Sequence, residues 1–595
     1  MRRRGPLPVG PSAAAHPPWQ NRCVAPAFGP WWLLGAAALA PGAALPGWAA
    51  VSPLAAEAAP APADGAGGDG CVAAPDDAAL EASGAVIGQV AIRVGDIFNP
   101  ELEAENKDLF RLINRLHLNT RPRVIESLLL FRPGDPYDHR LVEESERLLR
   151  AERYLYDADV RPLRLCDGRV DLAVEVRDVW TLEASASYNR SGGEDRTRFE
   201  VEDTNLLGTG KHLAIARRAD VDRTMLLARY RDPALLGSRA RLDLWYSDNS
   251  DGGFQVFDLR RPFYALDARW GAGVRVRIDD RVDNRYVLGG LQDGFRHEQD
   301  FAEAFVGLSR GLRRGRAVRW LLGATYLDDR FGKAPEGKPL IDEPDNRTLA
   351  YPWLGFEVEG DDFRRTHNLD HLQRTEDLHL GLRLSGRLGW SSTRWGGDAE
   401  EAVFAFGAEK GFGLGSRGLL LLGAASSGRH GDQGFANFVT GGALRLYWRD
   451  FGQHLFYAEV SGDVAESLDG DNQLLLGGDN GLRGYPLRYQ EGDRRFLVTL
   501  EQRFYTPWHL FELIHLGAAV FADVGRAWGE SIFPTLPPTV PARETGTLRD
   551  VGFGLRISSS RSGRGTLVHL DVAFPLDGDP SIDRVQWLVT TKESF

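Results

Sequence analysis

Apolar and polar residues alternate with a period of two through most of this chain, from about residue 179 to its end at residue 595. In the segment 444–449, Leu444, Leu446 and Trp448 share one face of an extended strand, whereas Arg445 and Arg449 share the other. The same pattern is clear in three further segments, which are 239–246, 551–557 and 567–574. Such regular alternation indicates many β-strands, each with one apolar and one polar face.

The polar faces distinguish two β architectures. A soluble sandwich buries its apolar faces against a second sheet about 10 Å away, whereas a membrane barrel turns them outward and lines a wet lumen with polar groups. Repeated Arg and Asp on the polar faces favour the lumen. About 415 residues, at roughly 9–11 per spanning strand plus loops, predict an antiparallel transmembrane β-barrel of about 16 strands over residues 179–595. The predicted fold is therefore mainly β.

The composition favours a barrel over a helical membrane protein. The chain has 68 Gly, 29 Phe, 15 Trp and 15 Tyr but only 2 Met, which suits strands joined by turns and flanked by aromatic girdles. No segment beyond the N-terminus reaches the roughly 18 apolar residues of a membrane helix. A net charge of −12 argues against nucleic acid as a partner, because nucleic-acid binders show a basic stripe.

The first 50 residues are expected to be a signal peptide. Arginines at positions 2 to 4 precede the short apolar run 31–40, and small residues suitable for cleavage follow at 47–50. Pro41 and Pro46 interrupt the apolar stretch and argue against a transmembrane anchor. Export leaves two cysteines, Cys71 and Cys166, and an oxidising compartment permits a disulfide between them without requiring one.

Two further regions precede the barrel. Residues 51–84 are rich in Ala, Pro and Gly and are predicted to form a disordered linker. Residues 85–178 are predicted to form a compact domain with the order β-α-α-β-β. Its strands are expected near 89–94, 158–165 and 170–176, and its helices from about Thr120 and over about 139–151.

This domain resembles a POTRA domain, with Gly134, Asp135, Pro136 and Tyr137 before the second helix and Leu149 and Tyr154 at the step into the next strand. The resemblance implies a periplasmic module that guides unfolded substrate by pairing with it along a strand edge. A folded spacer without a binding role is the alternative.

The most specific motif is Gly-Gly-Asp-Asn-Gly-Leu-Arg-Gly-Tyr at 477–485. It resembles the tip of the sixth extracellular loop in the BamA/TamA/FhaC superfamily of outer-membrane assembly and secretion barrels. The resemblance implies that this loop folds back into the lumen and that its arginine meets acidic residues of the barrel wall. The residues that carry it are Gly477, Gly478, Leu482, Arg483, Gly484 and Tyr485.

Candidate wall partners follow the motif. Glu501 lies in the alternating segment 496–504, and Phe521, Asp523 and Gly525 resemble the family pattern F-x-D-x-G. An arginine inside a narrow lumen is costly unless carboxylates pair with it, and Glu501 and Asp523 on adjacent inward faces suit a planar guanidinium. The alternative is an ordinary hairpin with an exposed arginine.

The C-terminus resembles an outer-membrane targeting signal. Phe595 is the terminal aromatic residue, and Val585, Trp587 and Val589 share its face. Glu593 departs from the apolar residue expected there.

No catalytic centre, cofactor or metal site is predicted. Gly413, Gly415 and Gly418 precede a strand-like run rather than the helix of a nucleotide site. His367 and His371 are four residues apart but lack the glutamate of a zinc motif. The chain is therefore not expected to be an enzyme.

The resemblance implies an outer-membrane location, with the POTRA-type domain in the periplasm. The expected function is assembly and insertion of outer-membrane proteins, or their translocation. Alternatives are a two-partner secretion transporter for one exported protein and a porin-like surface protein. The expected partners are unfolded client proteins, the lipid bilayer, and periplasmic chaperones or lipoproteins.

Overall fold

The computed structural model describes residues 9–10, 71–334, 340–450, 452, 454–531, 546–563, 567–577, 580 and 582–592. The expected signal peptide and most of the expected linker lie outside the described residues, apart from β1 (Val9–Gly10), which pairs in parallel with β11. Phe595, expected to end a targeting signal, also lies outside them.

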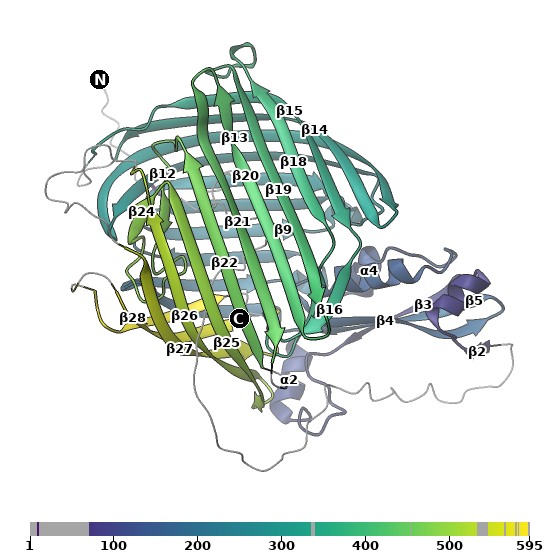
Figure 1. The fold of residues 1–595 in the computed structure, drawn as a ribbon. Coiled ribbons are helices and arrows are strands. Elements are labelled where there is room, and N and C mark those ends of the chain that lie inside the picture. Colours follow the sequence, from purple (N-terminus) through teal and green to yellow (C-terminus); the bar gives the residue numbers. More distant parts are fainter. Residues whose placement is uncertain are drawn as a thin grey trace, which may run out of the picture.

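Twenty antiparallel strands of the described chain form one closed barrel (Figure 1). Each strand pairs with the next along the chain, apart from short strands in two connections, and the last strand meets the first. The barrel strands are β6 (Leu182–Ser191), β7 (Glu194–Asp203), β8 (His212–Ala219), β9 (Thr224–Asp232), β10 (Arg241–Asn249), β11 (Asp251–Arg261), β12 (Trp270–Val287), β13 (Gly290–Arg313), β14 (Arg316–Lys333), β15 (Arg347–Gly360), β18 (Arg383–Ser391), β19 (Glu401–Leu414), β20 (Gly418–Gly431), β21 (Gly434–Arg449), β22 (Leu455–Glu466), β25 (Arg494–Leu510), β26 (Ile514–Trp528), β27 (Leu548–Ser559), β28 (Leu567–Pro575) and β29 (Gln586–Lys592).

The expectation of about 16 strands is wrong, although the closed antiparallel barrel is confirmed. Several connections are very short, so the same length of chain crosses the barrel more often than a generous loop allowance predicts. Examples are the two-residue turns 192–193, 288–289, 314–315 and 432–433.

The barrel wall is apolar outside and charged inside. Outward side chains such as Trp320, Leu354 and Leu388 are more than half exposed. Inward side chains such as Arg277 and Asp329 are buried. This arrangement inverts that of a water-soluble protein and matches a wall that faces hydrocarbon. No helix of the described residues is long and apolar enough to cross a membrane.

The N-terminal region, residues 71–178, lies at one end of the barrel, here called the proximal end; the other is the distal end (Figure 1). Its four-stranded sheet has the order β2-β4-β5-β3, with β3 parallel and β4 antiparallel to β5. The elements are β2 (Cys71–Ala73), α1 (Asp77–Ser83), β3 (Val86–Gly95), α2 (Asp108–Leu116), α3 (Pro122–Leu128), α4 (His139–Arg150), β4 (Leu155–Cys166) and β5 (Arg169–Asp178).

The predicted order β-α-α-β-β corresponds to β3, α3, α4, β4 and β5, with α2 as an added helix. Residues 71–84, predicted as part of the disordered linker, instead form β2 and α1. Leu80 of α1 is fully buried in the core of the region, which fixes this segment despite its Ala- and Pro-rich composition.

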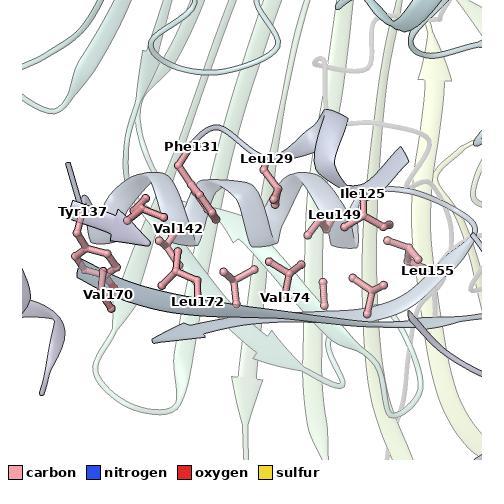
Figure 2. Close-up of a cluster of buried hydrophobic side chains, with 14 of the residues drawn as sticks. Ile125, Leu129, Phe131, Tyr137, Val142, Leu149, Leu155, Val170, Leu172 and Val174 are labelled. Carbon is pink, nitrogen blue, oxygen red and sulfur yellow. The ribbon is translucent and has the colours of Figure 1, made fainter. Parts of the chain in front are cut away.

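The core of the N-terminal region lies between the helices and one face of the sheet (Figure 2). Val142 and Leu149, seven residues apart, place one face of α4 over Val170, Leu172 and Val174 of β5. The Asp138 side chain caps α4 by accepting the backbone N–H groups of Arg140 and Leu141 in the first turn.

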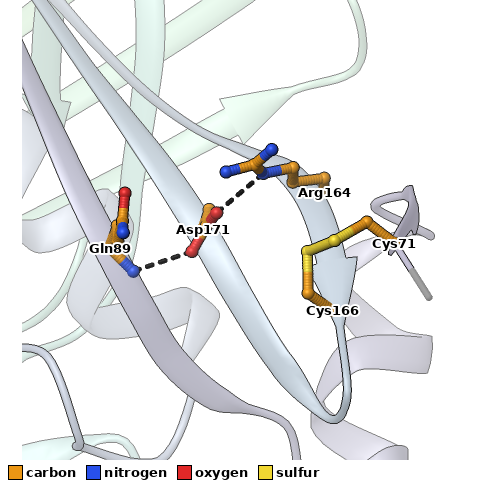
Figure 3. Close-up of a disulfide and its surroundings, with 5 residues drawn as sticks. All are labelled: Cys71, Gln89, Arg164, Cys166 and Asp171. Carbon is orange, nitrogen blue, oxygen red and sulfur yellow. Dashed lines mark hydrogen bonds and ion pairs between the residues drawn. A yellow bond between two sulfur atoms is a disulfide. The ribbon is translucent and has the colours of Figure 1, made fainter. Parts of the chain in front are cut away.

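A disulfide joins Cys71 on β2 to Cys166 at the end of β4 (Figure 3). Nearby, Asp171 accepts the backbone N–H of Gln89 at 2.7 Å and Arg164 Nε at 2.8 Å, which links β3, β4 and β5 across the sheet. The disulfide therefore fixes β2 to the rest of the sheet.

Candidate functional site

Residues 467–493, between β22 and β25, form a long connection at the distal end that folds into the barrel and is called the lumen loop. It contains the short strand pair β23 (Leu474–Leu476) and β24 (Gln490–Gly492). Leu476, Leu482 and Tyr485 are buried with Leu497 and Leu548 of the wall. The predicted motif thus lies inside the barrel, not on an exposed hairpin.

Arg483, at the tip of the lumen loop, is 1% exposed and forms a bidentate ion pair with Asp523 of β26. Its Nε lies 2.8 Å from Oδ2, and its Nη2 lies 3.1 Å from Oδ1. Thr499 Oγ1 donates to the same carboxylate at 2.7 Å, and the guanidinium lies over the Phe521 ring. Planar charge-assisted pairing of this kind fixes both position and orientation.

The residues after Arg483 continue the attachment to the wall. The Gly484 N–H donates to Asp550 Oδ2 at 3.1 Å. The Tyr485 hydroxyl donates to the Arg549 carbonyl at 2.7 Å, and burial raises the pKa of Tyr485 to about 12, so the hydroxyl keeps its proton. The tip is therefore held by β26 and β27 together.

Close backbone packing explains two glycines of the motif. A Cβ at Gly478 would lie 2.3 Å from the Tyr485 carbonyl oxygen, and one at Gly484 would lie 2.7 Å from the Asp550 Cβ. Both distances are shorter than a Cβ tolerates, so the loop closes on itself and on the wall only with glycine at these positions.

Glu501 occupies the neighbouring layer of the wall. It forms ion pairs with Arg503 at 2.9 Å and with Arg556 at 3.4 Å, and Arg556 in turn contacts Asp571 at 2.5 Å. The sequence predicts that Glu501 and Asp523 both receive Arg483. The structure gives Asp523 the loop arginine and gives Glu501 two arginines of the wall.

Additional arginine–carboxylate pairs attach other parts of the lumen loop. Arg488 of the loop pairs with Asp222 of the β8–β9 turn at 2.7 Å. Burial favours the neutral acid, but the Arg488 guanidinium holds the pKa of Asp222 well below its ordinary value. Across the barrel, Asp471 pairs with Arg347 and Asp469 with Arg429. The loop is thus fixed to several sides of the wall and occupies the distal lumen.

The proximal lumen holds a second insertion. Residues 363–379, between β15 and β18, form the inner hairpin, with strands β16 (Phe363–His367) and β17 (Thr375–His379). Leu369 and Leu372 at its tip are buried among residues of the barrel wall. Arg503 Nη1 donates to the Leu369 carbonyl at 2.7 Å, and the Tyr447 hydroxyl donates to Asp370 at 3.0 Å.

The inner hairpin also holds the N-terminal region. Arg150 of α4 forms a bidentate pair with Asp377, at 2.6 and 2.8 Å. Arg374 donates to the Leu155 carbonyl at 2.9 Å. Arg503 donates both to the Leu369 carbonyl of the hairpin and to the Glu501 carboxylate. Contacts therefore run from α4 through the hairpin to the charged residues of the barrel wall.

The barrel closes through a short seam between β29 and β6. Within the described chain, Val589 opposite Arg190 is the one register pair of this seam, whereas β28 and β29 pair continuously from Leu567 to Ala573. Next to it, the Thr591 N–H donates to the Asn189 side chain at 2.8 Å instead of to a backbone carbonyl. In the described residues the seam thus has a single register pair.

Sequence reasoning missed three parts of this site. Asp550 and Arg556 lie on the inward face of β27, and the alternation of that strand indicates their direction but not their partners. The tip of the inner hairpin, around Asp370, has no alternation that distinguishes it from an ordinary turn.

No protein-family model and no curated protein sequence matches this chain. Among solved structures, BamA from Haemophilus ducreyi lacking POTRA domains 1–3 is similar at 13% identity, covering 85% of this chain and 84% of that chain, with a TM-score of 0.35. CdiB from Escherichia coli is similar at 14% identity, covering 85% and 76%, with a TM-score of 0.40. CdiB from Acinetobacter baumannii is similar at 12% identity, covering 86% and 73%, with a TM-score of 0.38.

Proposed function

We propose that this chain is an outer-membrane barrel of the BamA/TamA/FhaC type that assembles or translocates client proteins, with a POTRA-type periplasmic domain in residues 85–178. The observation that carries the proposal is the seam. A β-strand whose edge lacks ladder partners can pair with a strand of another chain. In this barrel the weakly joined edge belongs to β6 and β29.

The state of the lumen supports this proposal over a porin. A porin needs an open aqueous channel. Here the lumen loop occupies the distal end, and the inner hairpin occupies the proximal end. Both are fixed by buried arginine–carboxylate pairs, among them Arg483 with Asp523 and Arg503 with Asp370.

Insertion is favoured over threading of one exported protein for the same reason. Threading requires both insertions to leave the lumen, whereas pairing at the seam leaves Arg483 and Asp370 in place. In this proposal the lumen-loop residues and their wall partners, including Gly525, have a conformational role: they hold the barrel in the form that exposes the seam. The clients are unfolded outer-membrane proteins, and periplasmic chaperones or lipoproteins deliver them.

Depletion of the protein, followed by quantitative proteomics of outer membranes and culture medium, tests this function. We expect several unrelated barrel proteins to fall together. Loss of a single large exported protein would instead indicate a dedicated translocon. Unchanged protein levels in both fractions would contradict the proposal and favour the porin-like alternative.

A further inference from the structure

Helix α2 has three distinct faces. Phe110 and Ile113 point into a small core, and Asp108, Arg111 and Arg115 form a charged face. The remaining face carries Leu109, Leu112 and Leu116, which are 61%, 51% and 67% exposed. Leucines at this spacing form one apolar stripe along the helix, and nothing in the described chain covers it.

The buried face of α2 holds the helix against the base of the barrel. Phe110 stacks on Phe98, and both pack near Trp180 and Leu513, which flank barrel strands. Arg561, in the β27–β28 connection, donates to the Ile97 carbonyl at 3.0 Å and pairs with Glu105 at 2.6 Å. Figure 1 shows α2 beside the proximal ends of β25 and β27. The helix therefore lies at the rim of the barrel.

Exposed apolar side chains continue along that rim on both sides of α2. On one side, Trp508 near the end of β25 and Phe511 of the β25–β26 turn are 61% and 78% exposed. On the other side, Leu207 of the β7–β8 turn is 58% exposed, next to Gly208, whose carbonyl accepts the Arg121 N–H that follows α2. Exposed apolar side chains of the rim thus flank α2, whose buried face packs against Trp180 just before β6.

The charged face of α2 suits the same surroundings. Lys107, Arg111 and Arg115 are exposed and recur every four residues beside the leucines. A short helix with apolar residues on one face and basic residues beside them lies in the membrane interface, where the basic groups reach lipid phosphates.

We propose that α2 is a membrane-interface helix whose leucine stripe inserts into the lipid leaflet at the proximal end of the barrel, beneath the seam. The occupant is phospholipid, because exposed apolar side chains of the barrel rim flank the stripe and cationic groups lie beside it. The proposal rests on the barrel spanning a membrane and is independent of whether the clients are inserted or threaded.

A fluorophore attached to the full-length protein tests this assignment. In a Cys23→Ser background, Leu112→Cys is labelled with an environment-sensitive dye and reconstituted into phosphatidylethanolamine and phosphatidylglycerol bilayers containing brominated phosphatidylcholine. Arg111→Cys on the charged face is the matched control, and Leu354→Cys on the outer wall reports whether the barrel is in the bilayer.

We expect brominated lipid to reduce the emission at position 112 by roughly half, and much less at position 111. Water-like emission at 112 with quenching at 354 would overturn the inference while leaving the membrane barrel intact. An apolar but unquenched environment at 112 would overturn it in favour of a protein partner. Absence of quenching at both 112 and 354 would contradict the membrane barrel and this inference together.

Discussion

Asp523 accepts hydrogen bonds from two nitrogens of Arg483 and from Thr499 inside the barrel wall. Both charges of the ion pair lose water on burial, so each depends on the other. Removing one partner leaves a buried charge without compensation, which costs free energy. Removing both partners leaves no buried charge and therefore avoids that cost. The pair therefore works as a unit that fixes the tip of the lumen loop.

We expect Arg483→Ala to leave the barrel folded but to weaken attachment of the lumen loop by about 3–5 kcal/mol, and to lower activity at unchanged protein level. Hydrogen exchange of residues 477–485 measures the loosening. Arg483→Lys should restore it only in part, because an ammonium group lacks the bidentate geometry. Arg494→Ala, at an exposed arginine beside the loop, is the control.

A double-mutant cycle tests whether the pair is coupled. Arg483→Ala combined with Asp523→Ala should loosen the loop less than the sum of the two single changes. Strict additivity, or wild-type activity of Arg483→Ala, would contradict the role assigned to the pair.

At this scale the sequence predicts much of the site. The alternation of inward and outward side chains along β25 and β26 places Glu501, Phe521 and Asp523 on the lumen face of the wall, and the motif brings Arg483 toward them. Which carboxylate takes the arginine depends on how deeply the loop enters the barrel. Alternation along a strand contains no information on that depth, so it does not predict the pairing of Glu501 with Arg503 and Arg556.

Among the elements, the inner hairpin is the part that joins the N-terminal region to the lumen. Arg150 and Asp377 meet there with side chains 5% and 17% exposed. We expect Arg150→Ala to raise hydrogen exchange in α4 and in 363–379 together, because the largely buried Asp377 carboxylate loses its partner. Arg123→Ala, at an exposed position of α3, should change neither. If Arg150→Ala left hydrogen exchange in α4 and in 363–379 unchanged, the hairpin would not be what holds α4.

The disulfide constrains a loop of 95 residues in the N-terminal region. Replacing both Cys71 and Cys166 by serine should lower the free energy of unfolding of this region by about 2–4 kcal/mol, mainly because the unfolded chain gains freedom. Urea titration read by pulse proteolysis measures the change. The wild-type protein is the reference, and an equal urea midpoint for the double variant and the wild type would contradict a structural role for the disulfide.

The elements differ in how far the sequence predicts them. Helices α3 and α4 and strands β3, β4 and β5 follow from periodicity and caps, and they lie close to the predicted ranges. The inner hairpin does not follow from periodicity, because its side chains are fixed by contacts with barrel strands distant in sequence. The sequence predicts about 16 strands instead of 20, because the lengths of the turns cannot be read from the alternation.

On the scale of the whole molecule, the barrel combines an occupied lumen with a weak closure. The lumen loop and the inner hairpin fix its two ends from inside, whereas β29 and β6 close the wall with one register pair in the described residues. Strain or client binding is therefore expected to separate the barrel at the seam before it dislodges either insertion.

An engineered disulfide across the β29–β6 seam tests most directly whether the seam must open for activity. Arg190→Cys with Val589→Cys places two thiols on the facing residues of β6 and β29, and Val572→Cys with Trp587→Cys places an equivalent pair across β28 and β29. The abundance of outer-membrane barrel proteins is then followed in cells that depend on each variant. We expect oxidation of the seam pair to lower the abundance of outer-membrane barrel proteins and reductant to restore that abundance. Oxidation of the control pair should have no effect. Normal abundance with a fully formed seam disulfide would contradict the account.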